Sequence, residues 1–158
     1  MAMQTTVIGQ SIPRLESNDK ATGRAEYIHT MRLPGMLHAK VFRSDTPHGR
    51  ILSIDTAEAA ALPGVHGVYK GEDILKVMPV PYYGPAFHDQ PILALEKVRY
   101  VGEPVAVVLA EDPHIAEEAA QLIYAEYEEL PAVYDEVEAM TSDAIVHDNA
   151  SQLIMRPF

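Results

Sequence analysis

A chain of 158 residues is close to the usual size of one domain, and 47% of its residues are apolar, which is enough to bury one core. Its 23 Asp and Glu against 12 Lys and Arg give a net charge of −11, which disfavours binding to nucleic acid or to anionic lipid. Cysteine is absent, which excludes disulfides, thiolate zinc sites, cysteine nucleophiles and cysteine-ligated iron–sulfur clusters on this chain. The sequence has no signal-like or membrane-length apolar run, so we expect a cytoplasmic protein.

The first half of the chain predicts an extended arm followed by short strands. Residues 1–20 are polar and mixed, with no sustained period, and form the expected arm. After the arm, turn residues and alternating apolar positions predict strands over 22–27, 37–42, 50–55 and 65–69, with one short helix over 57–62. Asp55 or Thr56 is expected to cap this helix by accepting a hydrogen bond from a free backbone N–H group.

The texture changes between Lys76 and Pro91, where prolines and aromatic residues crowd together. Proline cannot donate to a strand ladder, so this stretch is predicted to be a long loop with an aromatic surface. Its aromatic side chains and its polar neighbours suit either a channel lining and partner anchor or a loop folded onto its own core; they are Tyr82, Tyr83, Phe87, His88, Asp89 and Gln90.

The second half predicts a corner, a buried strand and a helix. The apolar run that follows Gly102 and Pro104 is typical of a buried strand. Gly102 can serve either a structural corner or the close approach of a ligand, and the corner is the interpretation favoured on physical grounds. An amphipathic helix over 113–125 and a strand over 124–128 follow, and residues 141–158 are expected to be a tail. Together these elements indicate an α+β domain.

No catalytic motif is present in the sequence. It has no glycine-rich phosphate loop, no paired histidines at helical spacing and no nucleophile elbow. The seven histidines are scattered, and surface or strand-packing roles account for them. The glutamates at 126, 128 and 129 fit a strand with solvated carboxylates better than a cation site.

Several separated blocks resemble one enzyme family in the expected order. The most informative is Val98-Arg99-Tyr100-Val101-Gly102-Glu103-Pro104-Val105-Ala106, which resembles a motif near the start of the molybdenum-binding subunit of the xanthine dehydrogenase/aldehyde oxidase family. The other blocks are 8–14, 19–27, 33–41, 48–65 and 127–133. The resemblance implies a mixed-sheet α/β hammerhead domain over residues 21–140, with 141–158 as the start of a linker to an absent molybdopterin-binding domain.

The resemblance also implies a role for the domain within a larger enzyme. Such enzymes insert a water-derived oxygen into a C–H bond and pass electrons through 2Fe-2S clusters, often to FAD. The molybdopterin loops and the catalytic glutamate belong to later domains, so we expect no cofactor on this chain alone and no catalytic residue in it. The implied partners are a molybdopterin-binding domain or subunit, an iron–sulfur subunit and, in some members, an FAD subunit.

One position is carried over from the family as a substrate-channel residue. Phe87 matches the phenylalanine that borders the substrate funnel, with Ala86 in place of a bulky leucine and His88 beside it. Tyr82 and Tyr83 are predicted to dock a partner, or to form a contact between copies of the isolated chain, and Gly102 with Pro104 to form a structural corner. A stand-alone scaffold or binding module that kept this fold, and a small independent enzyme, are the alternative hypotheses.

Overall fold

The computed structural model describes residues 8–84 and 89–147, and the chain divides into two units at Met36 and Leu37. The first unit contains a short helix, α1 (Ser17–Ala21), and a 3-10 turn, η1 (Ile28–Thr30), and neither has a buried residue. No strand forms over 22–27, so that prediction was wrong. The reason is local: the backbone N–H groups of Arg24 and Ala25 both donate to the Asp19 carbonyl, at 2.8 and 3.0 Å, and so extend the end of α1.

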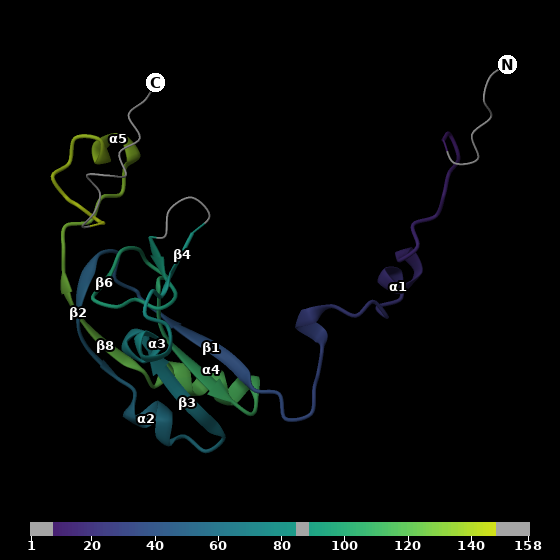
Figure 1. Cartoon of the computed structure of the whole chain (residues 1–158), viewed down its shortest axis with the longest axis horizontal. Coiled ribbons are helices and arrows are strands. Elements are labelled where there is room, and N and C mark those ends of the chain that lie inside the picture. Colours follow the sequence, from purple (N-terminus) through teal and green to yellow (C-terminus); the bar gives the residue numbers. More distant parts are fainter. Residues whose placement is uncertain (1–7, 85–88, 148–158) are drawn as a thin grey trace. The chain divides into compact units, whose positions relative to one another are not determined.

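The second unit has an α+β fold built from two three-stranded sheets and a two-stranded ribbon (Figure 1). The first sheet has the order β1-β7-β3 and the second the order β6-β2-β8; the ribbon pairs β4 with β5. The strands are β1 (His38–Arg43), β2 (Gly49–Asp55), β3 (Val65–Lys70), β4 (Tyr82–Tyr83), β5 (Gln90–Pro91), β6 (Lys97–Val98), β7 (Pro104–Ala110) and β8 (Tyr124–Glu129). Every pair in the described part is antiparallel, and the predicted α+β class is confirmed.

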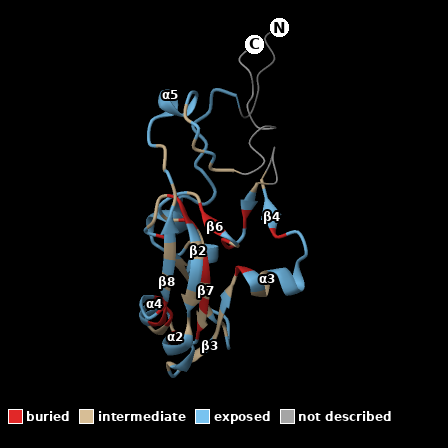
Figure 2. Ribbon diagram, turned by 90° about the vertical axis from the view of Figure 1, so that its left-hand side faces the viewer, coloured by how far each residue is buried: buried red, intermediate tan, exposed pale blue. Residues whose placement is uncertain are grey.

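Strand β7 is the centre of the first sheet. It pairs with β1 along one edge and with β3 along the other. Figure 2 shows buried residues along β7, whereas its neighbour β3 carries only intermediate and exposed residues. Ala106 and Val108 point to the face that is covered by the helices α2 (Ala57–Ala61) and α4 (Pro113–Gln121), and with them form the larger core cluster.

Helix α4 has the predicted buried face but is shorter than predicted. Its buried residues are Ala116, Ala119 and Ala120, at the spacing expected for one face of a helix. Asp112 caps its first turn, where Oδ1 accepts a hydrogen bond from the His114 N–H at 2.7 Å. The helix ends at Gln121, because Tyr124 already pairs with Asp55 in the second sheet. Asp55 also caps α2, as predicted: its Oδ1 accepts from the Ala57 N–H at 2.9 Å.

The stretch predicted as one long loop contains regular structure, so that prediction was only partly right. Helix α3 (Gly71–Val77) reaches into it, and the β4–β5 ribbon follows. Proline is compatible with this ribbon because Pro91 lies in a two-residue edge strand, where no ladder N–H is needed from it. The Ile92 N–H then donates to the Pro81 carbonyl at 2.9 Å and closes the base of the ribbon.

The chain after β8 also contains an element that the sequence pattern missed. This is α5 (Glu136–Ala139), a single turn in which the Asp135 carboxylate accepts hydrogen bonds from the N–H groups of Val137 and Glu138. Among the described residues, no helix combines the length and the apolar character needed to cross a bilayer.

Candidate functional site

The three predicted substrate-channel residues, Phe87, Ala86 and His88, lie outside the described residues. For these residues the structure describes only the two neighbouring strands, β4 and β5. The three residues follow Gly84 and precede Asp89, so they belong to the connection between β4 and β5. The ribbon is held at its base by two prolines, Pro81 and Pro91, that are both buried.

An exposed apolar surface lies on this ribbon and on the turn between β6 and β7. We call it the aromatic surface and define it as Val80, Tyr82, Tyr83, Tyr100 and Val101. Tyr83 and Tyr100 have 55% and 54% of their surface exposed, and Val101 has 62%. Partial burial raises the pKa of Tyr100 above its ordinary value, and the nearby Glu103 and Tyr83 act in the same direction. Because Tyr83 is near enough to raise the pKa of Tyr100, the ribbon and the turn lie close together at these two tyrosines.

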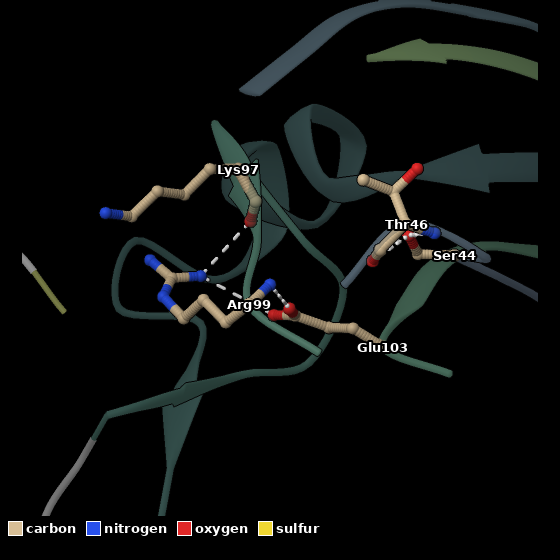
Figure 3. A network of polar contacts seen from close by, with 5 residues as sticks. All are labelled: Ser44, Thr46, Lys97, Arg99 and Glu103. Carbon is tan, nitrogen blue, oxygen red and sulfur yellow. Dashed lines mark hydrogen bonds and ion pairs between the residues drawn. The ribbon is translucent and has the colours of Figure 1, made fainter. Parts of the chain in front are cut away.

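A buried carboxylate organises the turn that presents Tyr100 and Val101. Glu103 is 1% exposed and is among the largest fully buried side chains described. Its Oε2 accepts a hydrogen bond from the Arg99 N–H, and its Oε1 lies 3.5 Å from the Arg99 guanidinium (Figure 3). The guanidinium also donates to the Lys97 carbonyl at 3.2 Å. The carboxylate therefore accepts the backbone hydrogen bond of Arg99 and also provides the counter-charge for its guanidinium.

The same turn is bonded to the end of β1. The Gly102 N–H donates to the Ser44 carbonyl at 2.7 Å, and the Ser44 N–H donates to the Glu103 carbonyl at 3.0 Å. The Arg43 guanidinium donates to the Gly102 carbonyl at 2.8 Å. Gly102 has φ +95°, a conformation that glycine adopts freely, and Pro104 begins β7 opposite Arg43. These bonds fix the turn at both ends.

Sequence reasoning placed Glu103 in the corner but did not predict its buried role, and it missed Ser44 as part of the corner. One signal for the role of Glu103 was available in the sequence. Its carboxylate stands between a glycine and a proline, immediately before an apolar strand, and a charge next to a buried strand needs a partner. Ser44 carried no such signal, because it sits in a polar loop where serine is common.

A second candidate surface is one face of the first sheet. The register places Val41, Val107 and Tyr69 side by side across the three strands, and Ala39 beside Leu109. We call these five residues the open sheet face. Val41, Val107 and Leu109 are only partly buried, Ala39 is exposed and Tyr69 is 42% exposed. None of the five belongs to either core cluster, whereas Val108, which points to the opposite face, is fully buried.

Metal ligands are not gathered in the described part of the chain. There, no group of three or more His, Asp or Glu side chains is positioned to hold a metal ion. What the described residues provide is two surfaces, one aromatic and one aliphatic.

Comparison with known proteins identifies the class to which this architecture belongs. Residues 22–131 match the family described as aldehyde oxidase and xanthine dehydrogenase, a/b hammerhead domain. The gamma subunit of the 6-hydroxypseudooxynicotine dehydrogenase complex of Paenarthrobacter nicotinovorans is 41% identical over 143 residues, which cover 85% of this chain and 18% of that protein. The large chain of carbon monoxide dehydrogenase of Hydrogenophaga pseudoflava is 40% identical over 78% of this chain and 15% of its own length.

Solved structures show the same relationship. Quinoline 2-oxidoreductase from Pseudomonas putida 86 superposes with a TM-score of 0.82 at 44% identity, over 93% of this chain and 19% of that one. The Cu,Mo-CO dehydrogenase superposes with a TM-score of 0.80 at 39% identity. The chain therefore belongs to the aldehyde oxidase and xanthine dehydrogenase family and has the fold of its α/β hammerhead domain, as the sequence motifs indicated. It spans less than one fifth of the length of these relatives.

We expect Gly102→Val to destabilise the domain by about 1–3 kcal/mol, the usual cost of a strained backbone conformation. A Cβ at this position meets no atom within 4 Å, so the cost comes from φ +95° and not from a clash. Gly102→Asn is the matched control and should lose less, because asparagine tolerates positive φ. Urea denaturation compares the three proteins, and an unchanged midpoint for the valine variant would contradict this account.

We expect Glu103→Ala to cost about 3 kcal/mol, because it leaves the mostly buried Arg99 without its counter-charge and the Arg99 N–H without an acceptor. Glu103→Gln should lose less, since the amide oxygen still accepts the backbone hydrogen bond. The same denaturation series measures both. Equal losses for the two variants would show that the backbone hydrogen bond contributes nothing measurable.

Proposed function

We propose that this chain is the hammerhead component of a cytoplasmic molybdenum hydroxylase, where it covers one side of the molybdopterin site and shapes the access of substrate. The observation that carries the proposal is the open sheet face. Relatives include proteins named as the nicotinate dehydrogenase large molybdopterin subunit of Eubacterium barkeri and the xanthine dehydrogenase molybdenum-binding subunit of Escherichia coli O157:H7. This chain matches only 33% and 20% of these two proteins, so the proposed partner is a molybdopterin-binding polypeptide that corresponds to the rest of such a subunit.

The sequence of β7 supports burial on both faces of its sheet. Pro-Val-Ala-Val-Val-Leu-Ala is a continuous apolar run, and strands with this pattern are buried on both sides, whereas a strand with one solvated face alternates apolar and polar residues. In the isolated chain only one face of β7 is covered along its whole length. Val107 and Leu109 point to the other face and remain partly exposed. A docked domain on the open sheet face supplies the missing cover.

The aromatic surface supplies a second contact, next to the loop expected to shape the funnel. Tyrosine side chains are favoured in interfaces because each combines a large apolar area with a polar tip. Tyr82 and Tyr83 lie on the ribbon that carries Phe87, so docking through this ribbon would hold the loop against the partner.

These surfaces imply different roles for this chain and for its partners in the proposed enzyme. The molybdopterin centre, when present in the partner, supplies the oxygen-insertion chemistry. The residues of this chain exclude water from one side of that centre and limit which substrates reach it. An iron–sulfur subunit and, in some assemblies, an FAD subunit complete the electron path of the proposed enzyme. If the chain were instead a stand-alone binding module, no molybdopterin-binding partner would be needed.

The double variant Val107→Thr/Tyr69→Ser tests the docking face. Threonine has nearly the shape of valine, but Tyr69→Ser removes a ring that is more than half buried, so we expect a stability loss of about 2 kcal/mol in an isolated chain that remains folded. We expect binding to the molybdopterin-binding polypeptide of the same organism to weaken by about tenfold or more, because apolar area at the contact is lost.

The matched control is Val108→Thr, the same chemical change on the opposite face of the same strand. It buries a hydroxyl and should cost about 1–3 kcal/mol of folding stability while leaving the affinity of the folded protein unchanged. Affinity is measured by titration calorimetry and stability by denaturation. Wild-type affinity of the double variant would exclude the open sheet face as the docking site, and failure of the wild-type chain to bind would favour the stand-alone module.

Phe87→Ala tests the expected funnel. If Phe87 borders the substrate path, the variant in the reconstituted enzyme changes the ratio of kcat/KM for two substrates of different size, while the thermal melt of the isolated chain stays as in the wild type. If Phe87 is a core residue, its truncation lowers stability by about 3–5 kcal/mol and leaves the ratio unaltered. Tyr83→Ala, on the same ribbon, is the control for a general loss of docking.

A further inference from the structure

One edge of β2 is paired over only part of its length. On one side β8 pairs with β2 from Gly49 to Asp55. On the other side β6 pairs only with Gly49 and Arg50, and the last hydrogen bond runs from the Ile51 N–H to the Glu96 carbonyl at 2.9 Å. In the described part of the chain, no hydrogen bond reaches residues 52–54 from the side of β6.

The chain leaves this edge for an identifiable reason. Immediately before β6, the Ala94 N–H donates to the Pro104 carbonyl of β7 at 2.7 Å, which draws the backbone toward the first sheet. The Ala94 carbonyl packs against Gly71 so closely that a Cβ on residue 71 would clash with its oxygen. The backbone at Ala94 is therefore held against β7 and α3, so it cannot pair with the rest of β2.

A cavity occupies the space that is left. It has a volume of about 380 Å³ and is lined on one side by Ile51, Leu52, Ser53 and Ile54, and on the other by residues that include Gly71 and Leu95. The ladder of β2 with β8 shifts register between Ile51 and Ser53, which leaves Leu52 in a bulge, and its side chain is 55% exposed. The cavity thus borders both unpaired backbone and an apolar side chain.

Charge distinguishes this edge from the outer edge of the same sheet. The free edge of β8 carries Glu126, Glu128 and Glu129, all exposed, and charged side chains on an edge strand oppose the addition of another strand. Residues 51–54 of β2 are uncharged. The charged pair at the rim of the cavity, Lys70 and Glu72, is an ion pair with 2.6 Å between Nζ and Oε1, so it offers no net charge to a ligand.

We propose that this cavity is a strand-addition site, in which an extended, uncharged segment of a partner polypeptide pairs with β2 beside residues 52–54 and continues the sheet where β6 ends. Backbone hydrogen bonds to β2 would supply the affinity, and an apolar side chain against Leu52 and Leu95 the preference. A second copy of this chain does not fit the site, because each copy has a net charge of −11 and presents the glutamates of its β8 edge. The proposal does not depend on the docking of a molybdopterin-binding domain.

The test uses the full chain and a synthetic pentapeptide, acetyl-Thr-Val-Thr-Val-Thr-amide, with an analogue whose alternate backbone amides are N-methylated. Amide hydrogen exchange is followed by NMR. With the parent peptide at saturation we expect the exposed amides of residues 52–54 to exchange about fivefold more slowly or better, since exchange reports local opening. The methylated analogue should give no protection, because it lacks the donors of a strand ladder.

Two variants make the test specific. Leu52→Lys places a charge at the proposed site and should weaken peptide binding by about fivefold or more, while Tyr124→Lys, on the β8 edge, should leave it unchanged. Equal protection by both peptides would mean that only side chains are recognised, and would overturn strand addition. Protection confined to β8, or no protection at millimolar peptide, would overturn the site itself.

Discussion

Pairing of β7 on both edges is the constraint on which the second unit depends. β1 and β3 lie far apart in the sequence from β7 and from each other, yet they meet only through it. The helices α2 and α4 then cover the face that carries Ala106 and Val108, and small residues on α4 allow the helix to approach the strand closely. The residues of the opposite face are equally apolar but are covered only near the start of β7, where Val105 packs with Ala94 and Val98. One strand thus forms the core of the domain and also leaves a surface for a partner.

The start of β7 is fixed by polar bonds as well as by the packing of Val105. Glu103 is buried at the point where the chain turns, and burial of a carboxylate is tolerated only when its oxygens are satisfied. Here the backbone of Arg99 and its guanidinium satisfy them, while Ser44 bonds to Gly102 and Glu103 from the end of β1. Because the turn is held from both sides, Tyr100 and Val101 project from a defined position even though both are exposed. A surface built on such a turn keeps its shape without help from a partner, which lowers the entropy lost on binding.

Much of the fold could be predicted from local patterns, and the failures have separate physical causes. Helical spacing from Ala116 to Ile123 was sufficient, because it reports directly which face is buried. Alternation over 37–42 predicted the strand but not its buried face, since Ala39 and Val41 lie on the open sheet face and Phe42 packs against the core. The expected strand over 22–27 does not form because two of its backbone N–H groups donate to the Asp19 carbonyl instead. Composition does not reveal this alternative hydrogen bonding. The ribbon between Tyr82 and Pro91 was missed because two paired residues leave no period to detect. The channel residues Phe87, Ala86 and His88 came from family likeness alone, and their role remains a prediction. The expected bounds of 21–140 for the domain also remain a prediction, although the compact unit starts at Leu37.

The position of β7 between β1 and β3 has a consequence for the order of folding. A ribosome releases β1 and β3 well before β7, and until β7 emerges neither strand has its partner in the first sheet. Local contacts cannot substitute, since the pairs that hold this sheet join distant parts of the chain, and such topologies fold slowly. During that interval the unpaired backbone edges of β1 and β3 are open to other chains. Nascent chains of this domain should therefore depend on a chaperone more than their modest size suggests.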